Sequence, residues 1–128
     1  MKVLVIDDNI DVAKATSITL QALGCDVETE DHPEKVIDEV DTLQPDLLIM
    51  DIGMPEINGY ELCRMLREHG ETETMIVAHT GWGNISDKER AFKAGFDDIL
   101  IKPVSLEQYQ GVIDATKNKL AATHTGIG

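Results

Sequence analysis

Five side chains capable of acid–base or phosphate chemistry stand where short apolar runs of the sequence end. They are Asp7, Asp8, Asp51, Thr80 and Lys102. If those runs are parallel strands of one sheet, their carboxyl ends meet at a single edge, where open α/β sheets bind their ligands. The fold would then gather three carboxylates, one hydroxyl and one ammonium into one cleft. Three carboxylates held so close repel one another, so a cation must offset their charge.

The carboxylates predict both the kind of cation and the reaction. Carboxylates without a neighbouring His or Cys suit a hard, oxygen-seeking ion, so we expect Mg²⁺, or alternatively Mn²⁺, rather than Zn²⁺. Mg²⁺ sites commonly share the ion with a phosphate group. Asp51 would act as the nucleophile, while Lys102 and the metal neutralise the transferring oxygens and Thr80 donates a hydrogen bond. The predicted chemistry is therefore phosphoryl transfer to Asp51.

The elements that must position these side chains alternate along the chain. Apolar runs predict strands at residues 2–7, 26–30, 46–51, 74–80 and 98–102, and amphipathic helices begin near residues 9, 33, 58, 86 and 105. Leu47–Met50 is apolar throughout and predicts a strand buried on both faces, whereas Asp26–Glu30 predicts a half-exposed edge strand. Five strand–helix pairs with short connections predict an α/β fold, a single doubly wound sandwich around a five-stranded parallel sheet.

The helices show recognisable starts and apolar stripes. Ser86–Glu89 and Ser105–Gln108 have the residue types of capping boxes, which predicts that two helices begin there. The predicted apolar stripes include Ile10 in the first helix, Met65 in the third and Leu106 in the last. These stripes are the surfaces expected to cover the sheet.

The composition excludes several classes of function. The 128 residues carry a net charge of −13, which disfavours nucleic-acid binding through this domain because phosphate contacts need Lys and Arg. No apolar run approaches the roughly 20 residues of a membrane helix and no signal peptide is recognisable, so we expect a cytoplasmic protein without membrane contact. Cys25 and Cys63 lack metal-ligand spacing and are interpreted as ordinary thiols. We expect one domain over residues 1–121 and a disordered tail over residues 122–128.

The order of these motifs resembles one protein family over nearly the whole chain, from Met1 to about Leu120. The matching segments are Val5–Asn9, Asp51–Gly59, Thr80–Gly81, Ala94–Asp98 and Lys102–Pro103. Together they resemble a CheY-like receiver domain of the response regulators of two-component signalling and phosphorelays. The resemblance implies a flavodoxin-like sheet with strand order 2-1-3-4-5. It also implies a signalling switch rather than an enzyme that turns over a diffusible substrate.

The resemblance assigns the acidic residues to one site. Asp51 would be the phosphoacceptor, taking its phosphoryl group from a phosphohistidine on a sensor histidine kinase or a histidine phosphotransfer protein. Asp8, Asp51 and the backbone carbonyl of Gly53 would bind Mg²⁺ directly, and Asp7 would act largely through water. The first helix, through residues such as Ile10, would dock the phosphodonor.

The resemblance also assigns the switch and shows one departure from it. Thr80 and Lys102 would bind the phosphoryl group, with a cis peptide bond before Pro103 aiming the lysine. Receivers commonly carry Tyr or Phe where this chain has Ile99, so we expect the output to run through the loop after Thr80 or through dimerisation. Trp82 lies in that loop and is interpreted as a partly exposed ring that covers the start of the next helix. The alternative is that this ring restricts the water that hydrolyses phosphorylated Asp51.

The same residue types are compatible with other interpretations. Asp7-Asp8 could be a helix cap, although the company of Asp51 and Lys102 favours the site. An aspartate-nucleophile phosphatase would need a second Asp where Gly53 stands, and a flavodoxin-type cofactor binder would need a Ser/Thr/Gly-rich first loop. A phosphorylation-independent interaction module is the remaining alternative. His79 is interpreted as structural because strand alternation turns it away from the Thr80 side, and the remaining histidines as surface residues: His32, His69 and His124.

Overall fold

The strand β3, Leu47–Asp51, lies at the centre of a five-stranded parallel sheet in the order β2-β1-β3-β4-β5. The computed structural model describes residues 1–54, 57–70, 73–81 and 85–125. The other strands are β1 Lys2–Ile6, β2 Asp26–Glu30, β4 Met75–Thr80 and β5 Asp98–Ile101. The helices are α1 Ile10–Ala22, α2 Val36–Leu43, α3 Gly59–Glu68, α4 Ile85–Ala94 and α5 Leu106–Thr125, with a 3-10 turn at Pro33–Lys35. The predicted doubly wound α/β fold and its strand order are confirmed.

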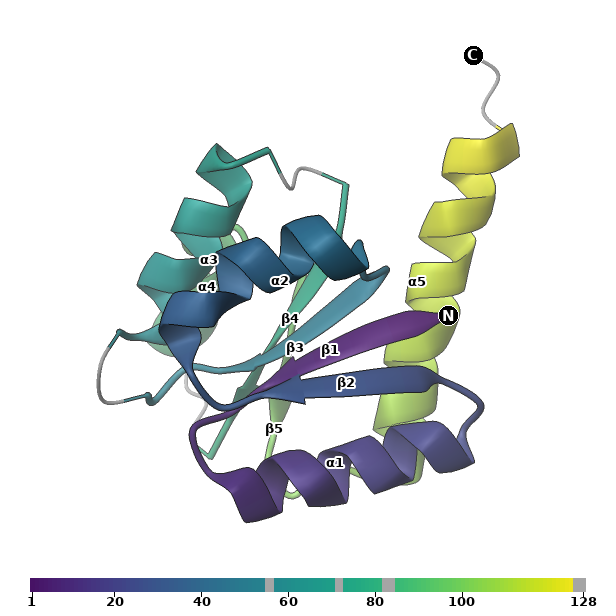
Figure 1. Ribbon diagram of the computed structural model, residues 1–128, viewed down its shortest axis with the longest axis horizontal. Helices are drawn as coiled ribbons and strands as arrows, with labels where there is room; N and C mark the ends of the chain where they lie inside the picture. The colour runs from purple at the N-terminus through teal and green to yellow at the C-terminus, as the bar shows by residue number, and fades with distance from the viewer. Residues whose placement is uncertain (55–56, 71–72, 82–84, 126–128) are drawn as a thin grey trace.

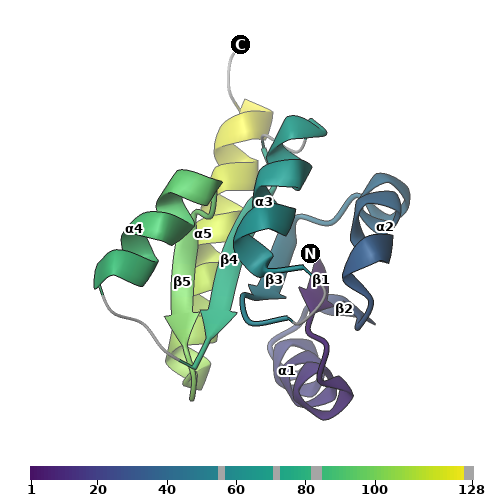
Figure 2. The same ribbon diagram turned by 90° about the vertical axis from the view of Figure 1, so that its left-hand side faces the viewer.

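Two layers of helices cover the sheet, with α1 and α5 on one face and α2, α3 and α4 on the other (Figures 1 and 2). The alternation of side chains along each strand explains this division. Val3 and Ile49 belong to the core beneath α1 and α5, whereas Leu4 and Met50 belong to the core beneath α2, α3 and α4. Because both faces of the central strands are covered, β1 is apolar from Val3 to Ile6 and β3 from Leu47 to Met50.

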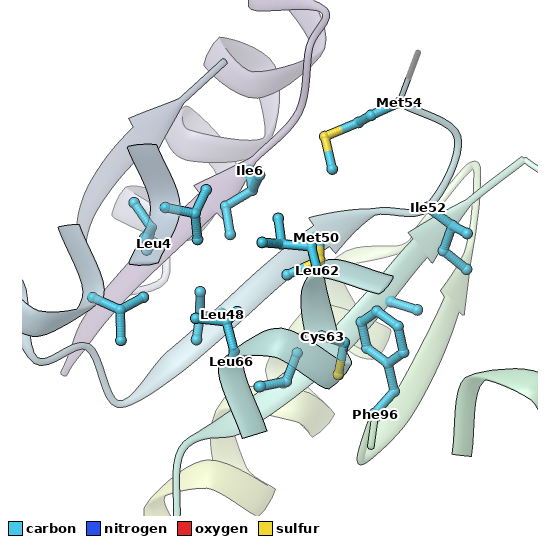
Figure 3. Close-up of a cluster of buried hydrophobic side chains, with 14 of the residues drawn as sticks. Leu4, Ile6, Leu48, Met50, Ile52, Met54, Leu62, Cys63, Leu66 and Phe96 are labelled. Carbon is cyan, nitrogen blue, oxygen red and sulfur yellow. The ribbon is translucent and has the colours of Figure 1, made fainter. Parts of the chain in front are cut away.

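The core beneath α2, α3 and α4 joins strand and helix side chains closely (Figure 3). Leu48 and Met50 of β3 meet Leu62 and Leu66 of α3, and all four side chains are fully buried or nearly so. Burying a large aliphatic side chain contributes about 1.5 to 3 kcal/mol. This packing holds β3, and therefore Asp51 at its end, in a fixed position relative to the neighbouring strands.

The helix starts are decided by local hydrogen bonds. The Asn9 side chain caps α1 by accepting from the backbone N–H groups of Asp11 and Val12, at 3.0 and 3.2 Å. The predicted capping box at Ser105–Gln108 is confirmed, because each of its end residues accepts the other's backbone N–H. α4 begins at Ile85, close to the predicted start near residue 86, but Ser86 lies within the helix and not in the capping position before it.

Three residues predicted on buried stripes are exposed: Ile10, Met65 and Leu106, at 53, 38 and 60%. Ile10 and Leu106 are the first residues of their helices, where the helix projects past the edge of the sheet and finds no core to cover. In α3 the sheet-facing positions belong to Leu62 and its neighbours at helical spacing, which leaves Met65 on the flank.

The last helix extends beyond the expected tail boundary. The sequence predicts a disordered tail from residue 122, but α5 continues to Thr125. Residues 126–128 and the predicted Trp82 loop lie outside the described residues. In the part of the chain that the structure describes, no helix is both long and apolar enough to cross a membrane.

Candidate functional site

Three carboxylates meet at the carboxyl ends of β1 and β3. Asp7 follows the last residue of β1, Asp51 is the last residue of β3, and these two strands are neighbours in the sheet. Oxygens of Asp7, Asp8 and Asp51 all lie within 4.8 Å of one another. Asp7 is buried, Asp51 half-buried and Asp8 exposed, so the cluster opens to solvent on one side. The predicted gathering of these three acids is therefore found in the structure.

The Asp7 carboxylate is the most buried member, with 2% of the residue exposed. Its Oδ1 accepts the backbone N–H of Asn9 at 2.9 Å, and its own N–H donates to the Glu30 carbonyl at 3.1 Å. Its Oδ2 is buried and accepts no hydrogen bond from the described residues. Burial raises the pKa of Asp7, the Asn9 N–H lowers it, and the nearby Asp51 charge raises it further. A buried carboxylate oxygen without a hydrogen bond, close to two other carboxylates, is an arrangement that a bound cation would stabilise.

Lys102 supplies a positive charge to this cluster, although it follows β5, which is separated from β1 in the sheet by two strands. Its Nζ lies 3.6 Å from Asp7 Oδ2. Its backbone N–H donates to the Thr80 carbonyl at 2.7 Å, which ties the segment after β5 to the end of β4. Thr80 is 2% exposed. The peptide bond between Lys102 and Pro103 is cis, as predicted.

The segment after Asp51 is held close to the strand end. The Gly53 N–H donates to Asp51 Oδ1 at 3.2 Å, and the Gly59 N–H donates to the Ile52 carbonyl at 2.9 Å. A Cβ atom on Gly59 would lie 2.7 Å from the Asp51 carbonyl oxygen and 2.8 Å from Ile52 Cα. Only glycine fits there without moving the backbone. The Asn58 side chain then caps α3 through the Glu61 N–H at 2.9 Å.

The donor set fits a divalent cation of the Mg²⁺ type. Three carboxylates offer hard oxygen ligands, one of them an oxygen without a hydrogen bond among the described residues, and neither His nor Cys belongs to the group. Its solvent-open side leaves room for the waters that Mg²⁺ retains. The electrostatic repulsion among the acids would fall when such an ion binds.

His79 lies beside the site but faces the other side of the sheet, as predicted. It is 3% exposed, and its Nε2 lies 3.3 Å from the Tyr109 hydroxyl of α5. Burial lowers the pKa of His79 to about 4, with the Lys102 charge as a smaller cause. The ring is therefore neutral at ordinary pH. His32 and His69 are exposed, as expected, and the side chain of His124 lies outside the described residues.

Ile99 occupies the position at which the family commonly has an aromatic ring. The side chain is half-buried and packs against the core that contains Phe96. In the sheet it lies opposite Ala78 of β4.

Asn9 and Gly59 belong to segments that the sequence already places around the site, but the contacts that each of them makes there come from the structure. The Asn9 N–H fixes the Asp7 carboxylate, and Gly59 allows the backbone to pass against Asp51. The signals for them were present, since Asn9 directly follows the acidic pair and Gly59 follows a helix-capping Asn. Their roles depend on contacts between backbone atoms, which residue type alone does not specify.

The sequence model of the response regulator receiver domain matches residues 3–114 of the chain. Response regulator MprA of Mycobacterium avium is 33% identical over 108 residues, which are 84% of this chain and 47% of that protein. The DNA-binding dual master transcriptional regulator RpaA of Synechocystis is also 33% identical over 108 residues, 84% of this chain and 45% of that protein. The chain thus spans about half the length of these curated relatives.

Solved structures show the same architecture. The chemotaxis protein CheY4 of Vibrio cholerae superposes with a TM-score of 0.83 at 27% identity, covering 90% of this chain and 97% of that one. A putative response regulator from Chloroflexus aurantiacus superposes with a TM-score of 0.81 at 33% identity, covering 94% of this chain and 97% of that one. Sequence and fold thus point to the same family.

Proposed function

This chain belongs to the response regulator receiver domain family, and from that premise we propose that it receives a phosphoryl group on Asp51 and signals its presence to a partner. Receiver domains are signalling switches that interact with histidine kinases or histidine phosphotransfer proteins. The donor proposed here is a phosphohistidine on such a protein. The observation that carries the proposal is the position of Asp51 at the end of β3, within 4.8 Å of two further carboxylates.

The proposed reaction is a direct transfer to the Asp51 carboxylate. A carboxylate oxygen attacks phosphorus, an acyl–phosphate bond forms, the phosphorus–nitrogen bond of the phosphohistidine breaks, and the leaving imidazole nitrogen takes up a proton. Asp7, Asp8, Asp51 and the Gly53 carbonyl would hold a divalent cation, which supplies charge neutralisation at the phosphoryl oxygens when bound. Lys102, now 3.6 Å from Asp7, would turn to pair with the added phosphoryl oxygens. The Thr80 hydroxyl would donate a hydrogen bond to the same group.

The phosphodonor would dock on α1. Ile10 and Ile18 are exposed apolar residues on this helix, at 53 and 66%, and Asn9 at its cap is next to Asp8 of the acidic cluster. A protein seated on these isoleucines would bury them while presenting its phosphohistidine to Asp51. This docking surface belongs to the proposal and is typical of the family.

The output is proposed to run without a moving aromatic ring. Ile99 has no ring and already packs against the core, so it cannot swing between two pockets as an aromatic side chain would. A shift of Thr80 would instead alter the loop that follows it or a dimer contact. Amide NMR spectra before and after phosphorylation test this idea; unchanged shifts in β4 and β5 would count against a conformational output.

We also propose that the chain binds no nucleic acid itself and that it lies in the cytoplasm. The acidic charge of −13 supports a chain that does not itself bind nucleic acid, whereas RpaA is named as a DNA-binding protein and is about twice as long. A cytoplasmic location would place the site where histidine kinases expose their phosphohistidine.

Phosphorylation with a small donor tests the central claim. The chain is incubated with acetyl phosphate and Mg²⁺, and its intact mass is measured. Wild type is expected to gain one phosphoryl group and Asp51→Asn none. Asp114→Asn is the matched control, because Asp114 is exposed on α5, where it accepts a hydrogen bond from the Gln110 side chain at 2.9 Å. A mass gain in both wild type and Asp51→Asn, or in neither, would show that Asp51 is not the acceptor.

A further inference from the structure

A groove of about 240 Å³ lies between α3 and α4, on the face of the sheet opposite α1 and α5. The two helices run beside each other there (Figure 2). The groove is lined by Asn58, Tyr60, Glu61, Arg64, Arg90, Lys93 and Ala94. None of its side chains belongs to the acidic cluster around Asp51.

The groove carries the opposite charge to the rest of the chain. Three of the chain's 11 Lys and Arg residues line it, against a single acid, Glu61. The lining residues therefore carry a net charge of +2 in a protein whose net charge is −13, although burial raises the pKa of Tyr60 and the nearby Asp87 carboxylate raises it further. A guanidinium nitrogen of Arg64 lies 3.6 Å from a carboxylate oxygen of Glu61, and such an exposed ion pair contributes little to stability. Arg90 and Lys93 form no ion pair with the described residues.

The Arg90 guanidinium is held in place by an aromatic ring. It lies over Tyr60 at 4.2 Å from the ring centroid, within the range of a cation–π contact. The Tyr60 ring in turn packs edge-on against Phe96, 6.3 Å away, at the border of the core. A guanidinium fixed in this way loses less conformational entropy when it binds a planar anion. It also occupies the exposed face of Tyr60, so that a nucleotide base finds no free ring to stack on.

We propose that this groove binds an acidic peptide segment of a partner protein, with carboxylates paired to Arg64, Arg90 and Lys93. Arg fork geometry matches carboxylates, and a groove of this volume accommodates two or three acidic side chains. Nucleic acid and anionic membranes fit less well, because their dense charge is repelled by a chain of −13. A short peptide contacts the cationic groove alone, since charges beyond about 8 Å are screened at physiological salt.

The groove does not depend on the chemistry of Asp51. None of the lining residues belongs to the acidic cluster, and the groove is formed by α3, α4 and Asn58 in a chain that carries no phosphoryl group. The groove therefore exists in the unmodified chain. Binding to it is expected to be the same in Asp51→Asn as in wild type, so that this inference and the proposed phosphorylation can fail separately.

The test is an NMR titration of the full ¹⁵N-labelled chain with a hexaglutamate peptide blocked at both ends. Amide shift changes are expected in residues 58–64 and 90–94, and they should weaken as salt is added. In the variant R64A/R90A/K93A the affinity is expected to fall roughly thirtyfold, from about threefold for each exposed charge pair lost. The charge-matched control K14A/K35A/K117A, whose lysines lie outside the groove, should bind nearly as wild type does.

A second variant separates shape from charge. R64K/R90K keeps every charge but loses the planar forks, and it is expected to bind several-fold more weakly than wild type. It also changes little of the fold, so it remains informative if the triple variant unfolds. The proposal is overturned by shift changes spread over the surface, by equal loss in the control variant, or by no binding at all. Tighter binding of tripolyphosphate than of the peptide at the same amides would make the groove a phosphate site instead.

Discussion

Lys102 Nζ lies 3.6 Å from Asp7 Oδ2, although the strands that these residues follow, β5 and β1, are separated in the sheet by β4 and β3. The long lysine side chain thus crosses the edge of the sheet at which Asp51 stands. One ammonium faces three carboxylates, so the site keeps a net negative charge. A cation or the removal of an acid should therefore stabilise the fold.

Replacing Asp7 by Asn is expected to raise the free energy of unfolding at pH 7 by about 1 to 4 kcal/mol, the size of one charge pair at about 4 Å in water or near a protein surface. Asn keeps an oxygen for the Asn9 N–H and removes the charge. Folding raises the pKa of Asp7 above its ordinary value of 3.8, so the folded chain loses stability as the pH rises through this range and the carboxylate becomes charged. The pKa of Asp7 therefore also predicts that removing the charge stabilises the fold at pH 7.

Urea unfolding with and without Mg²⁺ measures this effect. Mg²⁺ should stabilise wild type more than Asp7→Asn, since the variant has fewer carboxylates to offer the ion. Asp114→Asn serves as the control and should respond like wild type. Destabilisation by Asp7→Asn in metal-free buffer would contradict the repulsion argument.

Replacing Gly59 by Ala is expected to destabilise the chain by about 1 to 3 kcal/mol, because the new methyl group would overlap backbone atoms of Asp51 and Ile52. It should also slow phosphorylation by acetyl phosphate, since the strand end must shift. Gly111→Ala is the matched control: Gly111 lies inside α5, and apart from the neighbouring backbone of that helix no described atom lies within 4 Å of its Cβ position. That change should stabilise by up to about 1 kcal/mol. Thermal unfolding of both variants decides between the two signs.

The buried His79 is expected to make the chain sensitive to mild acid. Its pKa falls from the ordinary 6.5 to about 4 on folding, so the unfolded chain takes up a proton that the folded chain refuses. Stability present above pH 6.5 is lost as the pH falls toward 4, by roughly 3 kcal/mol if the full shift acts.

The measurement is urea unfolding between pH 7 and pH 4.5 for wild type and His79→Gln. Gln retains a partner for the Tyr109 hydroxyl but does not titrate. The wild type should lose more stability than the variant across this range, and carboxylate titrations common to both cancel in the difference. Parallel curves for the two proteins would mean that His79 does not account for acid sensitivity.

Arg67 is expected to be the most costly exchange among the charged residues of α3. Its guanidinium donates to the Gly95 carbonyl at 2.9 and 2.7 Å and to the Thr74 carbonyl at 2.8 Å, and it pairs with Asp97 at 2.9 Å. Arg67→Ala should lower the free energy of unfolding by about 3 kcal/mol, because two part-buried carbonyls lose their donors.

Arg64→Ala, one helical turn from Arg67, is the control for this change. Arg64 is exposed and, among the described residues, forms an ion pair with Glu61 alone, at 3.6 Å, so its loss should cost less than about 1 kcal/mol. Arg67→Lys should recover only part of the stability, since one ammonium cannot reach every acceptor. Equal costs for Arg67→Ala and Arg64→Ala would show that the Arg67 network is not structural.

The sequence by itself determined the fold and the acidic members of the site. Asp51 ends an apolar run, and Asp7 and Asp8 end another, so a parallel sheet had to bring them to one edge. The alternation of strands and helices set the topology, and the residue types at Ser105–Gln108 marked a helix start correctly. These features follow from spacings of two to four residues along the chain, which a sequence shows directly.

Only the tertiary structure decided the contacts between distant segments. The reach of Lys102 across two strands to Asp7, the passage of Gly59 against Asp51 and the exposure of Ile10 at the end of α1 all depend on how the helices and loops pack on the sheet. The basic groove depends on the packing of α3 beside α4. A periodic pattern specifies which face of an element is apolar, but the neighbour that covers that face, and where the covering ends, is a property of the assembled core.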